Sequence, residues 1–106
     1  MSLQLVKEVM VSMLNDEFRV SGFGVTMTNG AMELPDVCGL MRAVRQYNQF
    51  NIDNDPYEEH DFGSLEWHND KVFWKIDYYD KTLQRWEDPL SSMCNRVLTV
   101  MLASEY

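Results

Sequence analysis

Residues 64–80, SLEWHNDKVFWKIDYYD, constrain the fold of this chain most strongly, because they alternate in character on both sides of Asn69-Asp70. Positions 72, 74, 76 and 78 are apolar or aromatic, and they alternate with a second set that includes Lys75 and Asp77. A period of two flanking a turn dipeptide is typical of a β-hairpin with one buried face. Some other part of the chain must therefore cover this face.

Three segments have helical spacing and could cover it. The first spans about residues 3–18, the second begins at Pro35-Asp36, and the third begins at Asp88-Pro89 and runs to the C-terminus or very near it. An acid before the helix and a proline in its first turn are favourable start signals. The three apolar stripes are Leu5, Val6, Val9, Met10, Met13 and Leu14; Val37, Leu40, Met41, Val44 and Tyr47; and Leu90, Met93, Cys94, Val97, Leu98, Met101 and Leu102.

A short strand is expected at residues 24–28, where GVTMT precedes the turn dipeptide Asn29-Gly30. Residues 31–34 could return as its partner. Together these elements predict an α+β fold in a single domain, residues 1–106, with three helices packed on a small antiparallel sheet that contains the β-hairpin. The apolar stripe of the first helix is expected to pack on the sheet, and an exposed stripe would instead support a homodimer.

The charge of the chain is strongly asymmetric. Nine Lys and Arg against seventeen Asp and Glu give a net charge of −8. Residues 1–50 hold five acids and four bases, whereas residues 51–106 hold twelve acids and five bases, and no Lys or Arg occurs between Arg45 and Lys71. A pI near 4.5 argues against direct binding to nucleic acid or to an anionic membrane, since both require cationic side chains. The expected partner is a basic protein surface.

Targeting and redox signals are absent from the sequence. No apolar run reaches the roughly twenty residues of a membrane span, and the N-terminus lacks a basic leader and a cleavage site. Cys38 and Cys94 lie far apart on apolar stretches, so we expect two buried thiols and no disulfide. These features predict a cytoplasmic protein.

Residues 48–63, NQFNIDNDPYEEHDFG, have no regular period, and a loop of this length is commonly functional. A calcium loop starting at Asp53 fails, because Glu58 stands where glycine is required. No zinc pattern is present, and we expect no cofactor and no catalytic residue. A weaker metal site at Glu59, His60 and Asp61 stays open.

Two uses of this loop remain possible. In the first, its carboxylates imitate phosphates and aromatic side chains anchor a partner. In the second, Lys75 and Asp77 join Glu59, His60 and Asp61 in an acid–base or metal site. Whether the protein is an enzyme is thus uncertain, although a binding role fits the charge better. The candidate partner-binding residues are Asp53, Asp55, Tyr57, Glu58, Glu59, Asp61 and Trp86.

Four blocks, in order, resemble a known family. They are Asn15-Asp16 with Phe18-Arg19, DNDPYEEHDFG at 53–63, KIDYYD at 75–80 and RVLTVMLASEY at 96–106. The chain resembles the bacterial domain-of-unknown-function family 3768, whose members are small single domains found on chromosomes, plasmids and phages. This resemblance implies no established activity, and it marks 53–63 and 75–80 as a signature.

The sequence therefore favours a small acidic, non-enzymatic interaction protein of bacterial or mobile-element origin. An inhibitor of a nuclease defence, such as a restriction or CRISPR complex, would fit its size, its acidity and the setting that the resemblance implies. The alternative is a small enzyme or metal-binding module centred on the Glu59–Asp61 segment.

Overall fold

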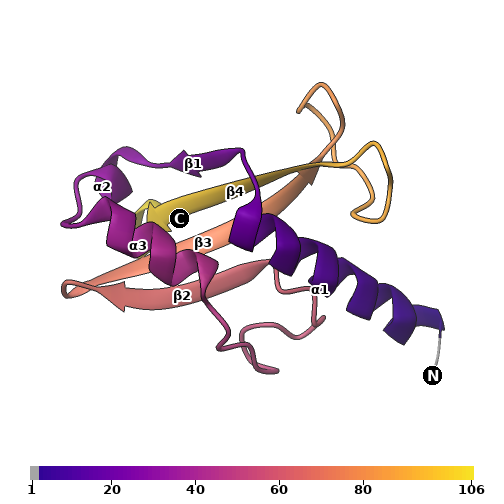
Figure 1. Cartoon of the computed structure of the whole chain (residues 1–106), viewed down its shortest axis with the longest axis horizontal. Coiled ribbons are helices and arrows are strands. Elements are labelled where there is room, and N and C mark those ends of the chain that lie inside the picture. Colours follow the sequence, from indigo (N-terminus) through magenta and orange to yellow (C-terminus); the bar gives the residue numbers. More distant parts are fainter. Residues whose placement is uncertain (1–2) are drawn as a thin grey trace.

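A four-stranded sheet with helices against one face forms the body of the molecule in the computed structural model, which describes residues 3–106 and the side chains from Val6 onward (Figure 1). The strand order is β1-β4-β3-β2, with β1 parallel to β4 and the other neighbours antiparallel. The α+β class is confirmed, although the sheet is mixed and not wholly antiparallel. The elements are α1 (Leu3–Ser21), β1 (Val25–Met27), α2 (Asn29–Met32), α3 (Val37–Arg45), β2 (Phe62–Trp67), β3 (Asp70–Tyr79), β4 (Asn95–Leu102) and η1 (Ala103–Glu105).

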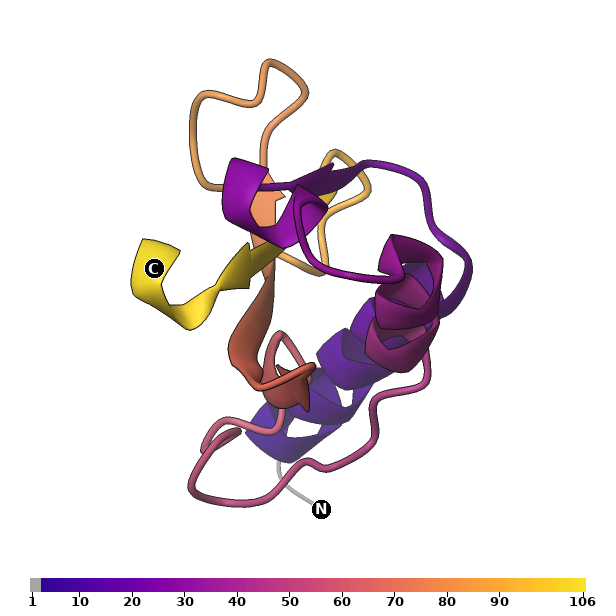
Figure 2. The same cartoon turned by 90° about the vertical axis from the view of Figure 1, so that its left-hand side faces the viewer.

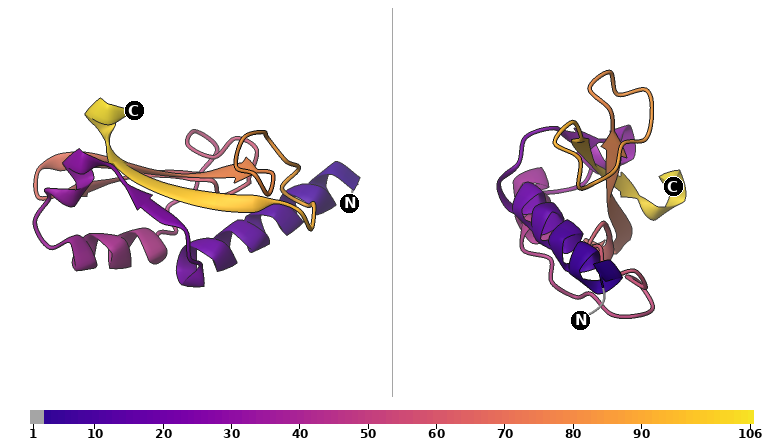
Figure 3. Two further views of the ribbon diagram at one scale, coloured as in Figure 1. Left: turned by 90° about the horizontal axis from the view of Figure 1, so that it is seen from above. Right: turned by 90° about the vertical axis from the view of Figure 1, so that its right-hand side faces the viewer.

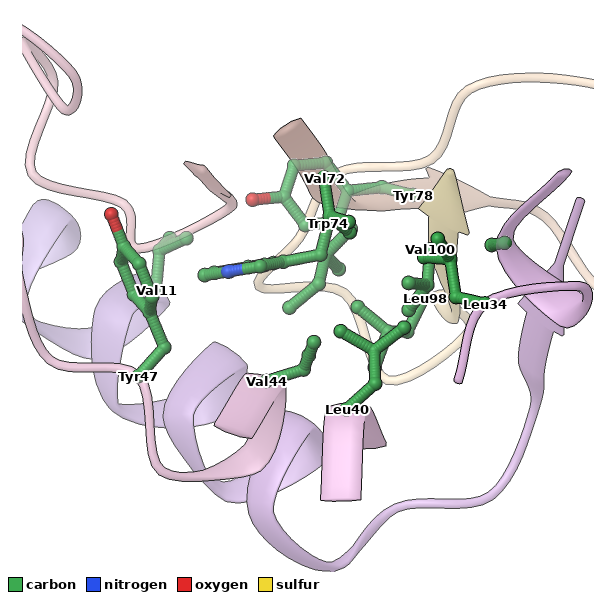
Figure 4. Packing of buried hydrophobic residues seen from close by; sticks show 12 residues of the cluster. Val11, Leu34, Leu40, Val44, Tyr47, Val72, Trp74, Tyr78, Leu98 and Val100 are labelled. Carbon is green, nitrogen blue, oxygen red and sulfur yellow. The ribbon is translucent and has the colours of Figure 1, made fainter. Parts of the chain in front are cut away.

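The predicted hairpin is the centre of the fold. Strands β2 and β3 pair from Phe62↔Lys75 to Trp67↔Asp70, so the turn is formed by His68-Asn69, one residue before the predicted dipeptide Asn69-Asp70. His68 and Asn69 have positive φ of 49° and 71°. The even-numbered residues of β3 from 72 to 78 are all buried, and Trp74 is fully inaccessible to solvent. They pack with α3 and β4 in one core (Figure 4). From α3 and β4, this cluster contains Leu40, Val44, Leu98 and Val100.

Helix α3 begins where the sequence predicted. The Asp36 side chain accepts a hydrogen bond from the Gly39 backbone N–H at 3.0 Å, which satisfies a donor in the first turn. The helix then presents Leu40 and Val44 to the sheet, and Tyr47 follows them into the core. Helices α3 and α1 lie on the same side of the sheet (Figures 2 and 3).

The predicted third helix is wrong. Residues 95–102 form strand β4, which pairs with β3 from Val72↔Leu102 to Tyr79↔Asn95 and with β1 on its other edge. The three-four spacing of the apolar residues after Asp88 is compatible with a helix, but Leu98 and Val100 also have the period of two that a strand needs. Pairing to two neighbours satisfies the backbone groups of β3 and β1, so the tertiary context decides the conformation.

The suggested strand at residues 31–34 is also wrong, since Asn29–Met32 is the short helix α2. Thr28 caps it by accepting a hydrogen bond from the Ala31 N–H at 3.3 Å. The Glu105 carboxylate accepts from the Gly30 N–H at 3.1 Å and from the Thr28 hydroxyl at 2.5 Å, which ties α2 to η1, directly after β4. Local capping therefore replaces the expected hairpin.

Helix α1 is present as predicted, but the face that it turns toward the core is not the predicted one. Its inward face is formed by Val11, Asn15 and Arg19, whereas the apolar stripe expected in the core faces solvent. The side chain of Leu5, part of that stripe, lies outside the described residues. The guanidinium of Arg45 donates to the carbonyls of Arg19 and Val20 at 3.1 Å and so caps the C-terminal end of α1.

Both cysteines are free thiols, as expected. Cys38 is exposed, so its predicted burial is wrong, whereas Cys94 is half-buried. Among the described residues, no helix has the length and apolar character that crossing a membrane requires.

The close approach of β2 to Trp74 predicts a stability defect on Gly63→Ala. An added Cβ would overlap the buried indole of Trp74, which has no room to move. We expect the free energy of unfolding in urea to fall by about 1–3 kcal/mol. The adjacent control Ser64→Ala should stay within about 0.5 kcal/mol of wild type. Equal stability of the two variants would contradict this packing.

Candidate functional site

A buried amide, that of Asn15, joins four parts of the chain. Its Nδ2 donates to the Glu59 carbonyl at 2.9 Å and to the Tyr78 hydroxyl at 2.8 Å, and its Oδ1 accepts from Arg96 Nε at 2.7 Å. Asn15 is wholly inaccessible to solvent. The contacts connect α1, β3 and β4 to the segment between α3 and β2, which we call the acidic loop (residues 48–61).

Two carboxylates of the acidic loop, those of Glu59 and Asp61, lie close to each other beside this amide. The Tyr78 hydroxyl donates to Glu59 Oε2 at 2.9 Å. Burial, with the neighbouring charge of Glu59 as the next cause, raises the pKa of Asp61 from 3.8 to about 6. Burial likewise raises the pKa of the Tyr78 phenol, so the phenol remains a proton donor at neutral pH. Asp61 is thus a carboxyl that titrates close to neutrality.

Asp55 holds the turn of the acidic loop. Its side chain is 5% exposed, and Oδ1 accepts from the backbone N–H groups of Glu59 at 3.0 Å and His60 at 3.2 Å. Glu58 and His60 have left-handed backbones, with φ of 55° and 56°. Such conformations are uncommon for residues other than glycine and persist where the surroundings impose them. The loop is therefore fixed by its own polar contacts.

His60 fastens the loop to α1. Its Nδ1 lies 3.0 Å from the Asp16 carboxylate, which accepts the hydrogen bond. Its ring stacks on Phe50, with 3.9 Å between centroids and 3° between planes. On the inner side, Arg19 donates to the Tyr47 carbonyl at 2.9 Å, and its guanidinium lies 4.9 Å from the centroid of Trp74.

The candidate partner-binding residues divide into two groups. Asp53, Tyr57, Glu58 and Trp86 are exposed, and Tyr57 and Trp86 are 71% and 70% accessible. The other three face inward: Asp55 is buried, while Glu59 and Asp61 are half-buried in the network. The exposed group is fully accessible to another molecule, whereas the carboxylate of Asp55 is not.

Small hollows flank the loop on two sides. One of about 280 Å³ lies between α1 and the loop and is lined by residues that include Val9, Ile52 and His60. Another, of about 240 Å³, places Trp86 beside Asp61 and Asp77. A larger hollow of about 610 Å³ lies at the C-terminal end of α1 and contains none of the sequence-predicted site residues. The two hollows at the loop are smaller than ordinary ligand pockets.

The five groups of the alternative acid–base site do not meet at one point, although Asp61 and Asp77 line the same 240 Å³ hollow. Lys75 and Asp77 pair with each other at 3.0 Å and alternate along β3 with its buried residues, so they lie on the opposite face of the sheet from Tyr78. His60 turns toward α1. Within the part of the chain whose side chains are described, no three His, Cys, Asp or Glu are arranged to hold a metal ion. The metal site suggested at Glu59, His60 and Asp61 is therefore not supported.

The residues that organise the site lie in two of the blocks that carry the family resemblance, but sequence reasoning assigned them no role. Asn15 and Arg96 are 81 positions apart, and no local pattern connects them. A signal did exist in α1, where Asn15 and Arg19 share one helical face with Val11, one or two turns apart. Polar side chains on the same face as a core residue indicate a buried network.

A small α+β domain with an acidic loop fixed by buried polar contacts is thus the class that fold and site define. The model of the family described as "Protein of unknown function (DUF3768)" matches residues 25–105, and the chain belongs to this family. The match includes the acidic loop, the hairpin and β4 but not α1. Comparisons with curated proteins and with solved structures give no match.

The raised pKa of Asp61 predicts a pH-dependent effect of Asp61→Asn. Between pH 3.8 and about 6, Asp61 is mostly protonated in the folded chain and mostly ionised in the unfolded chain. The free energy of unfolding therefore falls as the pH rises through this window. Allowing for solvent screening of this half-buried group, we expect Asp61→Asn to be about 1 kcal/mol more stable than wild type at pH 7.

The same comparison near pH 4 should show no difference between the two proteins. Urea denaturation across this pH range measures the effect, with Asp53→Asn as a control on an exposed loop carboxylate. A stability difference that does not change with pH would contradict the assigned titration.

Proposed function

We propose that this chain acts without catalysis, by presenting its acidic loop to a basic protein surface. The target class that we favour is the nucleic-acid-binding surface of a bacterial nuclease defence, such as a restriction or CRISPR complex, which the loop would block. The observation that carries the proposal is an exposed, cation-free acidic surface on a loop that is fixed in place.

The charge of the loop supports this proposal. Asp53 and Glu58 are exposed, and neither forms an ion pair with a Lys or Arg among the side chains described from Val6 onward. No Lys or Arg occurs between Arg45 and Lys71. Unpaired surface carboxylates raise the association rate with a basic partner and can take positions that phosphates would occupy.

The fixed conformation of the loop supports it further. Asn54 Nδ2 donates to the Gln49 carbonyl at 2.8 Å, and Asn51 Oδ1 accepts from the Asp53 N–H at 2.9 Å. Together with the Asp55 contacts, these bonds order the loop before any partner arrives. A preorganised surface loses less conformational entropy on binding, so more of the contact energy appears as affinity.

Two aromatic side chains supply apolar contact area near the charges. Tyr57 and Trp86 are exposed, and large aromatics are favoured as anchors at protein interfaces. Trp86 lies beside Asp61 across the 240 Å³ hollow. The proposed surface therefore centres on Asp53, Tyr57 and Glu58, with Trp86 as a second contact beside Asp61, and it leaves out the buried Asp55.

The alternative enzyme function has one supporting observation, the carboxyl of Asp61 with its pKa of about 6. A group that titrates near neutrality can act as a general acid or base. However, Asp77, which shares a hollow with Asp61, is paired with Lys75 at 3.0 Å, and His60 is engaged by Asp16. If Asp61→Asn abolished the cellular effect of the protein while its fold and partner binding were retained, the catalytic alternative would replace the binding proposal.

A capture experiment tests the proposal. The immobilised protein is exposed to a lysate of the native host at low and high salt, and bound proteins are identified. We expect a basic nucleic-acid-binding protein that is lost at high salt and displaced by competing DNA or RNA. Capture that is insensitive to both salt and nucleic acid would contradict the proposal.

Charge reversal identifies the surface. Asp53→Lys with Glu58→Lys should weaken binding to the captured partner by about tenfold or more, because two attractive contacts become repulsive. The matched control, Glu33→Lys with Asp70→Lys, makes the same change at two exposed acids outside the loop and should leave the affinity within about twofold. An equal loss of affinity in both double variants would contradict the assigned surface, because net charge alone would then explain the effect.

A further inference from the structure

Helix α1 exposes most of its apolar side chains and buries polar ones. Val6, Val9, Met10, Met13, Leu14 and Val20 are between 38% and 65% exposed. The opposite face is occupied by the buried Asn15 and Arg19, whose hydrogen bonds to the core fix the rotation of the helix. The helix therefore cannot turn its apolar stripe inward. A contiguous apolar face that the fold holds in solvent is typical of an interaction site.

The spacing of this face is that of a helix–helix seam. Residues 6, 10, 13, 17 and 20 follow intervals of four, three, four and three, which repeat every seven residues along one side of a helix. Val6, Met10, Met13 and Val20 occupy four of these positions, and Glu17 occupies the fifth. The seam thus has one charged position near its C-terminal end.

We propose that the occupant of this seam is α1 of a second copy of the chain, paired antiparallel. In an antiparallel pair centred between residues 11 and 12, Met10 lies opposite Met13 of the partner subunit. Glu17 then lies beside Lys7 of the partner subunit, and the symmetric contact repeats at the other end. A parallel pair would place the two Glu17 carboxylates against each other, at a cost from like-charge repulsion.

The two charges are available for this contact. Lys7 and Glu17 are exposed, and neither belongs to an ion pair formed by the side chains described from Val6 onward. They are ten residues apart on one helix and do not reach each other. In the antiparallel dimer each of them meets an opposite charge, so this pairing accounts for both the apolar stripe and the charge in it.

The charge of α1 also argues against a lipid surface as the occupant. Interfacial helices that bind anionic membranes place several Lys or Arg beside the apolar face. Here Lys7 is the one exposed cation among the described side chains of α1, because Arg19 is 3% exposed and faces the core. The net charge of −8 would further oppose approach to an anionic bilayer.

Light scattering coupled to size exclusion, over a range of concentrations, tests the dimer on the full chain. We expect a concentration-dependent mass that approaches twice 12.5 kDa. Met13→Glu should weaken the dimer by about 30-fold or more, since it places a charge at the centre of the seam. Met32→Glu is the matched control, because Met32 on α2 is 60% exposed and Met13 is 65% exposed. Circular dichroism confirms that both variants fold.

Charge exchange tests the antiparallel register. Lys7→Glu and Glu17→Lys should each weaken the dimer by about threefold to tenfold, and the double variant should restore it. A monomeric wild type, a dimer insensitive to Met13→Glu, or a double variant no tighter than the single variants would overturn the proposal.

Sedimentation of the wild type with anionic vesicles, abolished by Met13→Glu, would overturn it in favour of a lipid surface. The loop variant Asp53→Lys with Glu58→Lys should still dimerise, so failure of the dimer and failure of the binding function are separable.

Discussion

The buried side chain of Asn15 is the contact on which the arrangement of this molecule depends. Its amide donates to the acidic loop and to β3 and accepts from β4, so one group satisfies partners on three elements. A buried amide left without these partners would cost about 1–3 kcal/mol for each unmade hydrogen bond. The network therefore fixes the rotation of α1 and the path of the loop together.

Two exposed features follow from this internal constraint. Because α1 turns Asn15 and Arg19 inward, its apolar stripe remains in solvent, where a second helix can cover it. Because the loop backbone is held by hydrogen bonds at residues 53 and 58–60, the positions from which Asp53 and Glu58 project are fixed. The proposed dimer seam and the proposed binding surface are thus two consequences of one polar network.

The sequence predicted the elements whose patterns are local. The hairpin within residues 64–80 and the helix after Asp36 depend on neighbouring residues, and both are confirmed, although the turn of the hairpin is His68-Asn69 and not Asn69-Asp70. Strand β4 was predicted as a helix because its apolar spacing fits both periods, and only the unpaired edges of β3 and β1 decide between them. The acidic loop was identified from its charge, whereas the burial of Asp55 depends on backbone groups that folding brings to it.

Hydrogen exchange of the acidic loop measures the central claim most directly. If the buried network fixes the loop, the amides of Glu59 and His60 are protected in the wild type, and Asn15→Ala speeds their exchange by about tenfold or more relative to the amides of the β2–β3 hairpin. Wild-type amides of Glu59 and His60 that exchange as fast as those of an unstructured peptide would contradict the account.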